Sequence, residues 1–290
     1  GYTFNSSTVY KVNDQTNTAN TGYDGRLREA RFRTPYPSTP EGIEYKTEKN
    51  GTVSIMGYHG TGKNVVIPAE IEGKRVIQIY YEAFCGVDVK SIHIPAGVMW
   101  VEDAFMGCTT LESITVDENS TAFTSENGVL FTKDKAILVA YPAAKKDLTY
   151  TVPDTVKYLW SAAFAFNTNI KEVIIPEGVE EISYDAFSGC SSLEKLEIPD
   201  SVTCIYIDAL DGTAYYNNAD NWENGILYCG NHLIEAKETV SGNYSIRPGT
   251  KTVAWHAFED CDNLTGIIIP DGVVYIGWHA FDGCTSLKNV

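Results

Sequence analysis

Basic residues and long apolar runs are scarce in this sequence of 290 residues. Its 22 Lys and Arg stand against 38 Asp and Glu, which gives a formal charge of −16. Affinity for nucleic acid depends mainly on Lys and Arg contacts to phosphate groups, so no nucleic-acid partner is expected. No apolar run reaches the roughly 18 residues of a membrane-spanning helix, so no membrane insertion is expected either.

Motifs for metal binding and catalysis are also missing. The seven cysteines include no Cys-x-x-Cys pair, and neither G-x-S-x-G nor H-E-x-x-H occurs. The stretch 57–64 matches G-x-x-x-x-G-K, but Asn64 stands where a phosphate-binding loop has Ser or Thr, and a strand pattern follows instead of a helix. We interpret this stretch as a glycine turn. We expect no cofactor, no metal site and no enzymatic activity.

A repeat of 23 residues dominates what is present. The stretch from Ile175 to Glu197 is echoed from Ile198 and from Ile269, with the template I-P-x-x-V-x-x-I-x-x-x-A-F-x-x-C-x-x-L-x-x-I. So small a unit cannot bury its own apolar residues, and neighbouring units must therefore stack into a solenoid. The L-x-x-L-x-I and V-x-x-I segments predict short strands, and A-F-x-x-C predicts a tight turn. The anchor after Ala recurs at Phe84, Phe105, Phe164, Phe187, Leu210, Phe258 and Phe281.

Most of the cysteines occupy a fixed position in this repeat. Four of the seven cysteines occupy the third place after the anchor, where stacked units need a small, weakly polar, buried residue, so we predict a structural role for them. A disulfide between Cys204 and Cys229, which lie outside this position, stays open at this stage. The four repeat cysteines are Cys108, Cys190, Cys261 and Cys284.

The repeated Ile-Pro, Ala-Phe, Cys and L-x-x-I positions closely resemble the BspA-like (Treponema-type) leucine-rich repeat family of bacterial surface proteins, over about residues 43–290. The resemblance implies a leucine-rich repeat solenoid that is β-rich, with short parallel strands lining one face and little helix. It also implies a secreted or cell-surface protein that binds other macromolecules. The family supplies no catalytic residues to this sequence.

Two interruptions of the repeat predict inserted β-hairpins, at about 116–150 and 214–245. Each has two apolar runs around a polar tetrapeptide, residues 132–135 or 229–232. Residues 42–290 are assigned to the solenoid, with an N-terminal β cap at about 42–67. Residues 1–41 are interpreted as a linker, a cap or the remnant of a preceding domain. The last strand pattern stops at Val290, so we expect further repeats to follow.

Two surfaces are candidate binding sites. An aromatic residue recurs two residues before the Ala that precedes the anchor. These residues predict a ridge that would bind sugar rings or a protein, or would seal the solenoid edge by lateral packing. The outward positions of the L-x-x-L-x-I strands predict a broad, mixed sheet face that suits a protein contact. The ridge residues are Tyr81, Tyr184, Trp255 and Trp278, and the sheet-face residues are His93, Thr115, Glu172, Ile174, Lys195 and Glu197.

The function predicted is that of a noncatalytic, adhesion-type module of an exported bacterial surface protein. Its expected partner is a protein, on a host or on a neighbouring cell. Two alternatives stay open: a carbohydrate-binding module that uses the aromatic ridge, with a glycan as partner, and a targeting arm of a larger enzyme. The expectation of function rests partly on the resemblance, since a fold alone does not fix a function.

Overall fold

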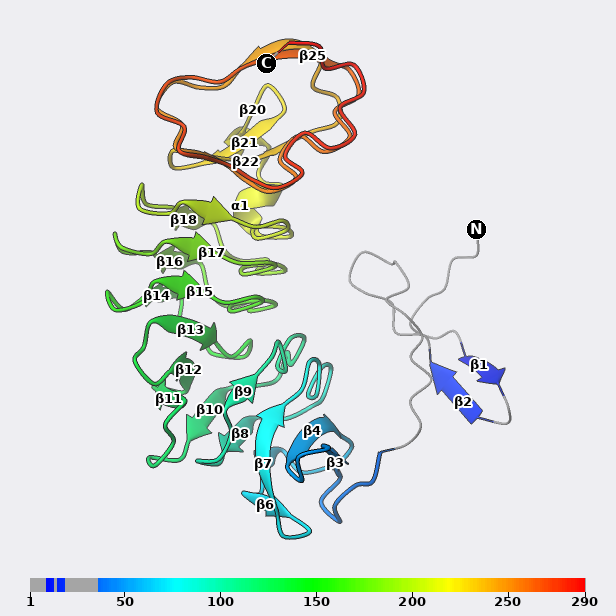
Figure 1. Cartoon of the computed structure of the whole chain (residues 1–290). Coiled ribbons are helices and arrows are strands. Elements are labelled where there is room, and N and C mark those ends of the chain that lie inside the picture. Colours follow the sequence, from blue (N-terminus) through cyan, green and yellow to red (C-terminus); the bar gives the residue numbers. More distant parts are fainter. Residues whose placement is uncertain (1–8, 13–14, 19–35, 290) are drawn as a thin grey trace. The chain divides into compact units, whose positions relative to one another are not determined.

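The computed structural model describes residues 9–12, 15–18 and 36–289 (Figure 1). The chain divides into two compact units, Gly1–Pro37 and Ser38–Val290. In the first unit, β1 (Val9–Val12) and β2 (Gln15–Thr18) form an antiparallel pair. The second unit carries all the repeats. The predicted boundary between residues 41 and 42, and the role of residues 1–41, stay predictions.

The second unit is a β-solenoid, as predicted, and its L-x-x-L-x-I segments form short parallel strands. Neighbouring strands pair in register, so that Glu172 lies opposite Lys195 and Ile174 opposite Glu197. Alternate residues point into the core or outward, because side chains on a strand alternate between its two faces. The strands form three separate sheets: β5 (Asn64–Val66), β8 (Ser91–Ile94) and β10 (Ser113–Val116); β14 (Thr149–Thr151), β16 (Glu172–Ile174) and β18 (Lys195–Glu197); β23 (Gly242–Ser245) and β25 (Leu264–Ile268).

The V-x-x-I segments build a second parallel surface, called here the V-x-x-I face. Its strands are two to six residues long, and all except β26 contribute a buried aliphatic residue such as Leu159, Ile182 or Ile205. Helix is confined, in the described residues, to α1 (Ala214–Asn217) and the 3₁₀ turn Ala219–Asn221. The strands of this face are β7 (Lys74–Ile79), β9 (Trp100–Val101), β13 (Ile137–Ala140), β15 (Tyr158–Leu159), β17 (Glu181–Ile182), β19 (Cys204–Ile205), β22 (His232–Ala236), β24 (Thr252–Val253) and β26 (Tyr275–Ile276).

Hydrogen bonds at the corners explain the template. After three of the Ile-Pro pairs, the carbonyl of Pro95, Pro176 or Pro199 accepts from the backbone N–H of the Val three residues on, as in Pro199 to Val202 at 3.0 Å. In the A-F-x-x-C turn, the Phe187 carbonyl accepts from Cys190 N–H at 3.1 Å. The Cys190 thiol in turn donates to the Phe164 carbonyl of the preceding coil at 3.0 Å. The repeat cysteine therefore links one coil to the next.

The predicted hairpins are present, and each is larger than expected. β11 (Phe123–Glu126) and β12 (Val129–Thr132) precede β13, and β20 (Trp222–Glu223) and β21 (Ile226–Cys229) precede β22, so each insert is an antiparallel meander of three strands. The tetrapeptide 229–232 is not a polar loop, because Cys229 and His232 are fully buried strand residues. Cys204 and Cys229 are both free thiols.

The range predicted as an N-terminal cap contains strands, while its role as a cap stays a prediction. β3 (Ile43–Thr47) and β4 (Val53–Tyr58) form an antiparallel hairpin around Gly51, and β4 pairs in parallel with β7 of the first coil. A second small hairpin joins β6 (Glu70–Ile71) to β7. The glycine-rich stretch 57–64 comprises the end of β4, a loop and the first residue of β5, so no helix N-terminus stands there to bind phosphate.

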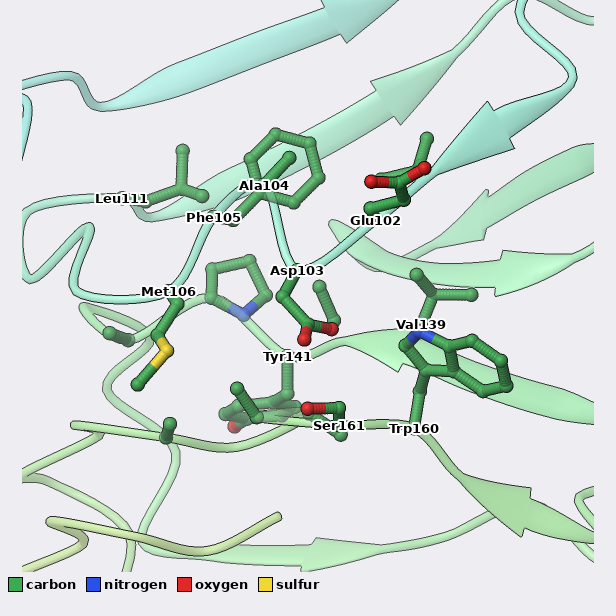
Figure 2. Close-up of a pocket in the computed structure, with 17 residues that line it drawn as sticks. Glu102, Asp103, Ala104, Phe105, Met106, Leu111, Val139, Tyr141, Trp160 and Ser161 are labelled. Carbon is green, nitrogen blue, oxygen red and sulfur yellow. The ribbon is translucent and has the colours of Figure 1, made fainter. Parts of the chain in front are cut away.

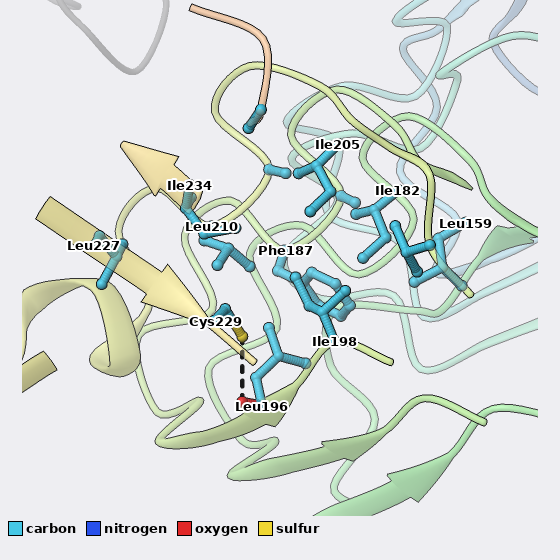
Figure 3. Close-up of a cluster of buried hydrophobic side chains, with 14 of the residues drawn as sticks. Leu159, Ile182, Phe187, Leu196, Ile198, Ile205, Leu210, Leu227, Cys229 and Ile234 are labelled. Atoms are coloured by element: carbon cyan, nitrogen blue, oxygen red, sulfur yellow. Dashed lines mark hydrogen bonds between the residues drawn. The ribbon is translucent and has the colours of Figure 1, made fainter. Parts of the chain in front are cut away.

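The buried residues form two hydrophobic clusters. The N-terminal cluster extends from Ile43 to Val139, and the C-terminal cluster extends from Val129 to Ala280. Part of the C-terminal cluster is drawn in Figure 3, where Phe187, Ile198 and Ile205 lie close together and the Cys229 thiol donates to the Leu196 carbonyl at 3.3 Å. The two clusters meet at the insert β11–β13.

Candidate functional site: an aromatic ridge on the V-x-x-I face

Three of the four predicted ridge residues lie in one row of ring contacts, and a fourth aromatic joins them. Trp255 is the centre: its ring centroid lies 4.3 Å from Tyr206, 5.8 Å from Tyr184 and 5.5 Å from Trp278. Tyr184 and Tyr206 are 4.5 Å apart. We call Tyr184, Tyr206, Trp255 and Trp278 the aromatic ridge. Tyr206, which the sequence places one residue away from the repeat position, is therefore a full member.

The insert β20–β22 is the reason that Tyr206 and Trp255 meet. Its coil pairs with the next one at Leu233, whose carbonyl accepts from Ala254 N–H at 2.9 Å. One residue further on, Trp255 N–H donates to the Ile205 carbonyl, also at 2.9 Å, and so bypasses the insert. Ile234 is buried within the insert, and the insert contributes no ring to the row. Coils that are distant in sequence thereby become neighbours.

Exposure differs along the ridge. The side chains of Trp278 and Tyr184 are exposed, with relative accessibilities of 63% and 39%, whereas Trp255 and Tyr206 are half-buried. Lateral packing and an open surface therefore coexist in one row. Tyr81, the remaining predicted member, lies in the turn after β7, beside the N-terminal hydrophobic cluster. The structure thus does not bring Tyr81 to the ridge.

Polar groups lie beneath the rings. Trp255 donates its indole N–H to the Tyr275 hydroxyl at 3.2 Å. Cys204, on the neighbouring β19, hydrogen-bonds Tyr275, and burial raises the pKa of its thiol. Glu181 on β17 is the register partner of Cys204, and burial raises the pKa of this carboxyl as well. Burial likewise raises the pKa of Tyr206, to about 12. At neutral pH the Cys204 and Tyr206 side chains are therefore neutral donors.

Two histidines flank the ridge. The rings of His256 and His279, which are 23 residues apart in the sequence, are stacked, with centroids 5.2 Å apart. Each Nδ1 lies 3.1 Å from the carboxylate three residues on, Glu259 or Asp282. Each imidazole thus lies beside a carboxylate of its own turn. Within the described part of the chain, no group of three or more His, Cys, Asp or Glu side chains is arranged to hold a metal ion.

The predicted sheet-face residues fall into two separate patches. Glu172 and Ile174 on β16 lie beside Lys195 and Glu197 on β18, and Tyr215 of α1 forms one wall of the shallow groove over these strands. His93 and Thr115 lie on β8 and β10, where the His93 Nδ1 and the Thr115 hydroxyl are 3.0 Å apart.

The sheet of β8 and β10 is not continuous with that of β16 and β18. The structure therefore brings the six predicted sheet-face residues together only as a pair and a quartet.

One small cavity lies between the coils of β9 and β15. Figure 2 shows Asp103 and Ser161 directed toward each other in it, and the two side chains are hydrogen-bonded. Burial raises the pKa of the Asp103 carboxyl. The cavity of 20 Å³ has room for about one water molecule. It is too small for a substrate, so it does not compete with the ridge as a ligand site.

Several solved structures are similar to this chain. Among solved structures, a leucine-rich repeat protein from Eubacterium ventriosum is 22% identical over 78% of this chain (TM-score 0.39). A leucine-rich cell surface protein from Faecalibacterium prausnitzii is also 22% identical, over 89% of this chain and 76% of its own (0.40). The leucine-rich repeat protein of T. pallidum is 23% identical, over 87% and 91% (0.35). The chain spans 47% of the length of the E. ventriosum protein.

No curated protein sequence matches the chain. None of the described helices is long and apolar enough to cross a membrane. The model of the BspA type leucine rich repeat region matches in six copies, over residues 63–130, 145–236 and 242–290. These three stretches cover well over half of the chain and contain the four repeat cysteines. The chain therefore belongs to the family of BspA-type leucine-rich repeat proteins.

Proposed function

We propose that this chain is a noncatalytic protein-binding module of an exported bacterial surface protein, and that the aromatic ridge is its contact surface. The observation that carries the proposal is the ring row itself: Trp255 touches three other rings, and the row ends on Trp278, whose side chain is 63% exposed. Exposed Trp and Tyr side chains held by rigid neighbours are typical of the residues that dominate protein interfaces.

A protein partner suits this ridge better than a glycan does. Sugar rings bind aromatic side chains through open ring faces, whereas the Trp255 ring is enclosed by Tyr206, stacked at 4.3 Å, and by two edge contacts with interplanar angles of 84° and 85°. Only the two ends of the row, Tyr184 and Trp278, are open. A glycan-binding module and a targeting arm of a larger enzyme are the alternatives, and no described cluster of groups supports catalysis in this chain.

The test compares two ridge tryptophans with one outside the ridge. Trp278→Ala is expected to leave the melting temperature nearly unchanged and to weaken binding to a protein identified on an array of purified matrix proteins. Loss of an interface tryptophan costs about 2 kcal/mol or more. Trp100→Ala is the control, because Trp100 is 55% exposed on β9 and has no part in the ridge.

Trp255→Ala is expected to lower both affinity and stability. The half-buried indole contacts three rings, so the free energy of unfolding should fall by about 1–3 kcal/mol, less than the about 3–5 kcal/mol of a fully buried aromatic. Chemical denaturation measures this change. Binding only to a glycan array, or equal loss in Trp100→Ala and Trp278→Ala, would contradict the proposal.

A further inference from the structure

The surroundings of the ridge are acidic. Asp185 follows Tyr184 directly, and Asp208 lies two residues after Tyr206. The Asp185 N–H donates to the Ile207 carbonyl, so these two turns are neighbours. Glu181 lies on β17 next to Cys204, and its charge contributes to the raised pKa of Tyr206. Carboxyl groups are therefore neighbours of the ridge residues Tyr184 and Tyr206.

Lysine and arginine side chains of this chain do not cover the ridge. The three cation–π contacts among the described residues are Lys145 with Tyr141, Lys237 with Trp222 and Arg247 with Tyr228, and none of them involves a ridge ring. Lys157, which precedes β15, pairs with Glu180 at 3.8 Å. Within the described residues, Glu181 makes no ion pair, and its carboxyl is partly withdrawn from solvent.

Rings and carboxyl groups in this arrangement are complementary to a cation. The face of a Trp or Tyr ring is electron-rich and attracts an ammonium or guanidinium group within about 6 Å. A neighbouring carboxylate adds a second attraction to the same group. The formal charge of −16 on the chain favours the approach of basic partners over acidic ones.

We propose that the aromatic ridge binds a basic segment of a protein partner, with Lys or Arg side chains placed over Tyr184 and Trp278 and beside Glu181. This inference rests on the proposed function and names the chemistry of the partner. Arginine fits the site best, because its planar guanidinium can stack on a ring and at the same time donate to a carboxylate.

The test uses a synthetic peptide with alternating Gly and Arg, a matched peptide with citrulline in place of Arg, and the whole chain at physiological salt. Calorimetry should detect binding of the Arg peptide and at least about tenfold weaker binding of the citrulline peptide. Trp278→Ala and Glu181→Gln should each weaken the Arg peptide by about tenfold, which corresponds to about 1.4 kcal/mol. Should Trp278→Ala fail to fold, Trp278→Leu replaces it.

The controls are Trp100→Ala and Glu102→Gln, which make the same two changes on the neighbouring exposed residues Trp100 and Glu102, outside the ridge. Both should bind the Arg peptide as the unaltered chain does. Equal weakening in the control and ridge variants would show unspecific charge attraction and would overturn the inference. Binding of a matrix protein that depends on Trp278, without binding of the Arg peptide, would overturn this inference and leave the proposed function standing. Binding of glycans alone would overturn both.

Discussion

The two inserts β11–β13 and β20–β22 have the same topology and opposite effects on the core. In each, an Asn-Gly turn joins the first two strands, with positive φ at both residues, as in Asn127 and Gly128 or Asn224 and Gly225. Such a turn matches the twist of antiparallel strands. The insert β11–β13 nevertheless stands between two hydrophobic clusters, whereas β21 and β22 are buried within one of them.

Side-chain alternation explains the difference. On β12, Val129 and Phe131 belong to the C-terminal cluster, whereas Leu130 between them belongs to the N-terminal cluster. On β21, the four consecutive residues Ile226 to Cys229 all belong to the C-terminal cluster. Since alternate residues point to opposite faces of a strand, β12 is a wall between two cores, while β21 lies inside one core. The same local sequence pattern therefore does not determine how an insert affects its neighbours.

The largest expected effect comes from truncating either face of this wall. Phe131→Ala and Leu130→Ala should lower the free energy of unfolding by about 3–5 and 2–5 kcal/mol, because both side chains are at most 1% exposed. Hydrogen exchange should show where protection is lost: in the coils after residue 150 for Phe131→Ala, and in the coils before residue 116 for Leu130→Ala.

The matched variant in the other insert is Leu227→Ala, whose side chain is fully buried in the C-terminal cluster. It should reduce protection on both sides of its own coil, since no wall separates them there. Identical exchange patterns in Phe131→Ala and Leu130→Ala would show that the two cores unfold as one. They would contradict the interpretation of β12 as a wall between two cores.

A second expected difference is pH dependence, which only β20–β22 should show through a histidine. His232 is fully buried, its Nε2 donates to the Pro199 carbonyl at 3.0 Å, and its Nδ1 accepts from the Thr252 hydroxyl at 2.8 Å. Burial lowers the pKa of this imidazole below its usual 6.5. The unfolded chain therefore binds the proton more readily than the folded chain does.

The stabilising contribution of neutral His232 is thus complete above about pH 6.5 and decreases as the pH falls toward the lowered folded-state pKa. Denaturation at a series of pH values should show this decrease in the unaltered chain and its loss in His232→Gln. The insert β11–β13 contains no histidine, so Phe131→Ala should keep the pH dependence of the unaltered chain. A pH profile unchanged by His232→Gln would refute this assignment.

The smallest expected effect concerns the turns that the inserts share. Asn127→Ala and Asn224→Ala should each lower the free energy of unfolding by about 1 kcal/mol, because Ala tolerates the left-handed region less well than Asn does. Both residues are exposed, so no packing is lost with them. Thermal denaturation should give similar values for the two variants. A clearly larger effect at one turn would mean that the turns are not equivalent.

Much of the fold could be predicted from the sequence because successive repeat units form the same hydrogen bonds. The Ile-Pro-x-x-Val stretches 94–98, 175–179 and 198–202 make the same corner, and each repeat Cys has a carbonyl to donate to, so one unit describes many. The break in the period predicts the position of each insert but not its additional first strand, which the Asn-Gly turn before β12 or β21, a strong hairpin signal, indicates.

The ridge could be predicted only in part. Period counting finds Tyr184, Trp255 and Trp278, because they share one position of the unit. It also includes Tyr81, which belongs to a coil on the far side of β11–β13, and it leaves out Tyr206. The contact between Tyr206 and Trp255 depends on the backbone bond from Trp255 to Ile205 across an insert. The sequence pattern does not show that the backbone of Trp255 bonds to Ile205, in the coil before the insert.

The cysteine position also governs redox chemistry. A thiol reacts with disulfides and oxidants as its thiolate, so a thiol that stays protonated and buried is inert. Burial raises the pKa of Cys108, Cys190 and Cys261 to about 12, and the first two donate their S–H to carbonyls of the preceding coil. Once folded, these coils therefore carry thiols that resist oxidation without forming disulfides. The unfolded chain has no such protection, so oxidants can react with these thiols only until the coils stack.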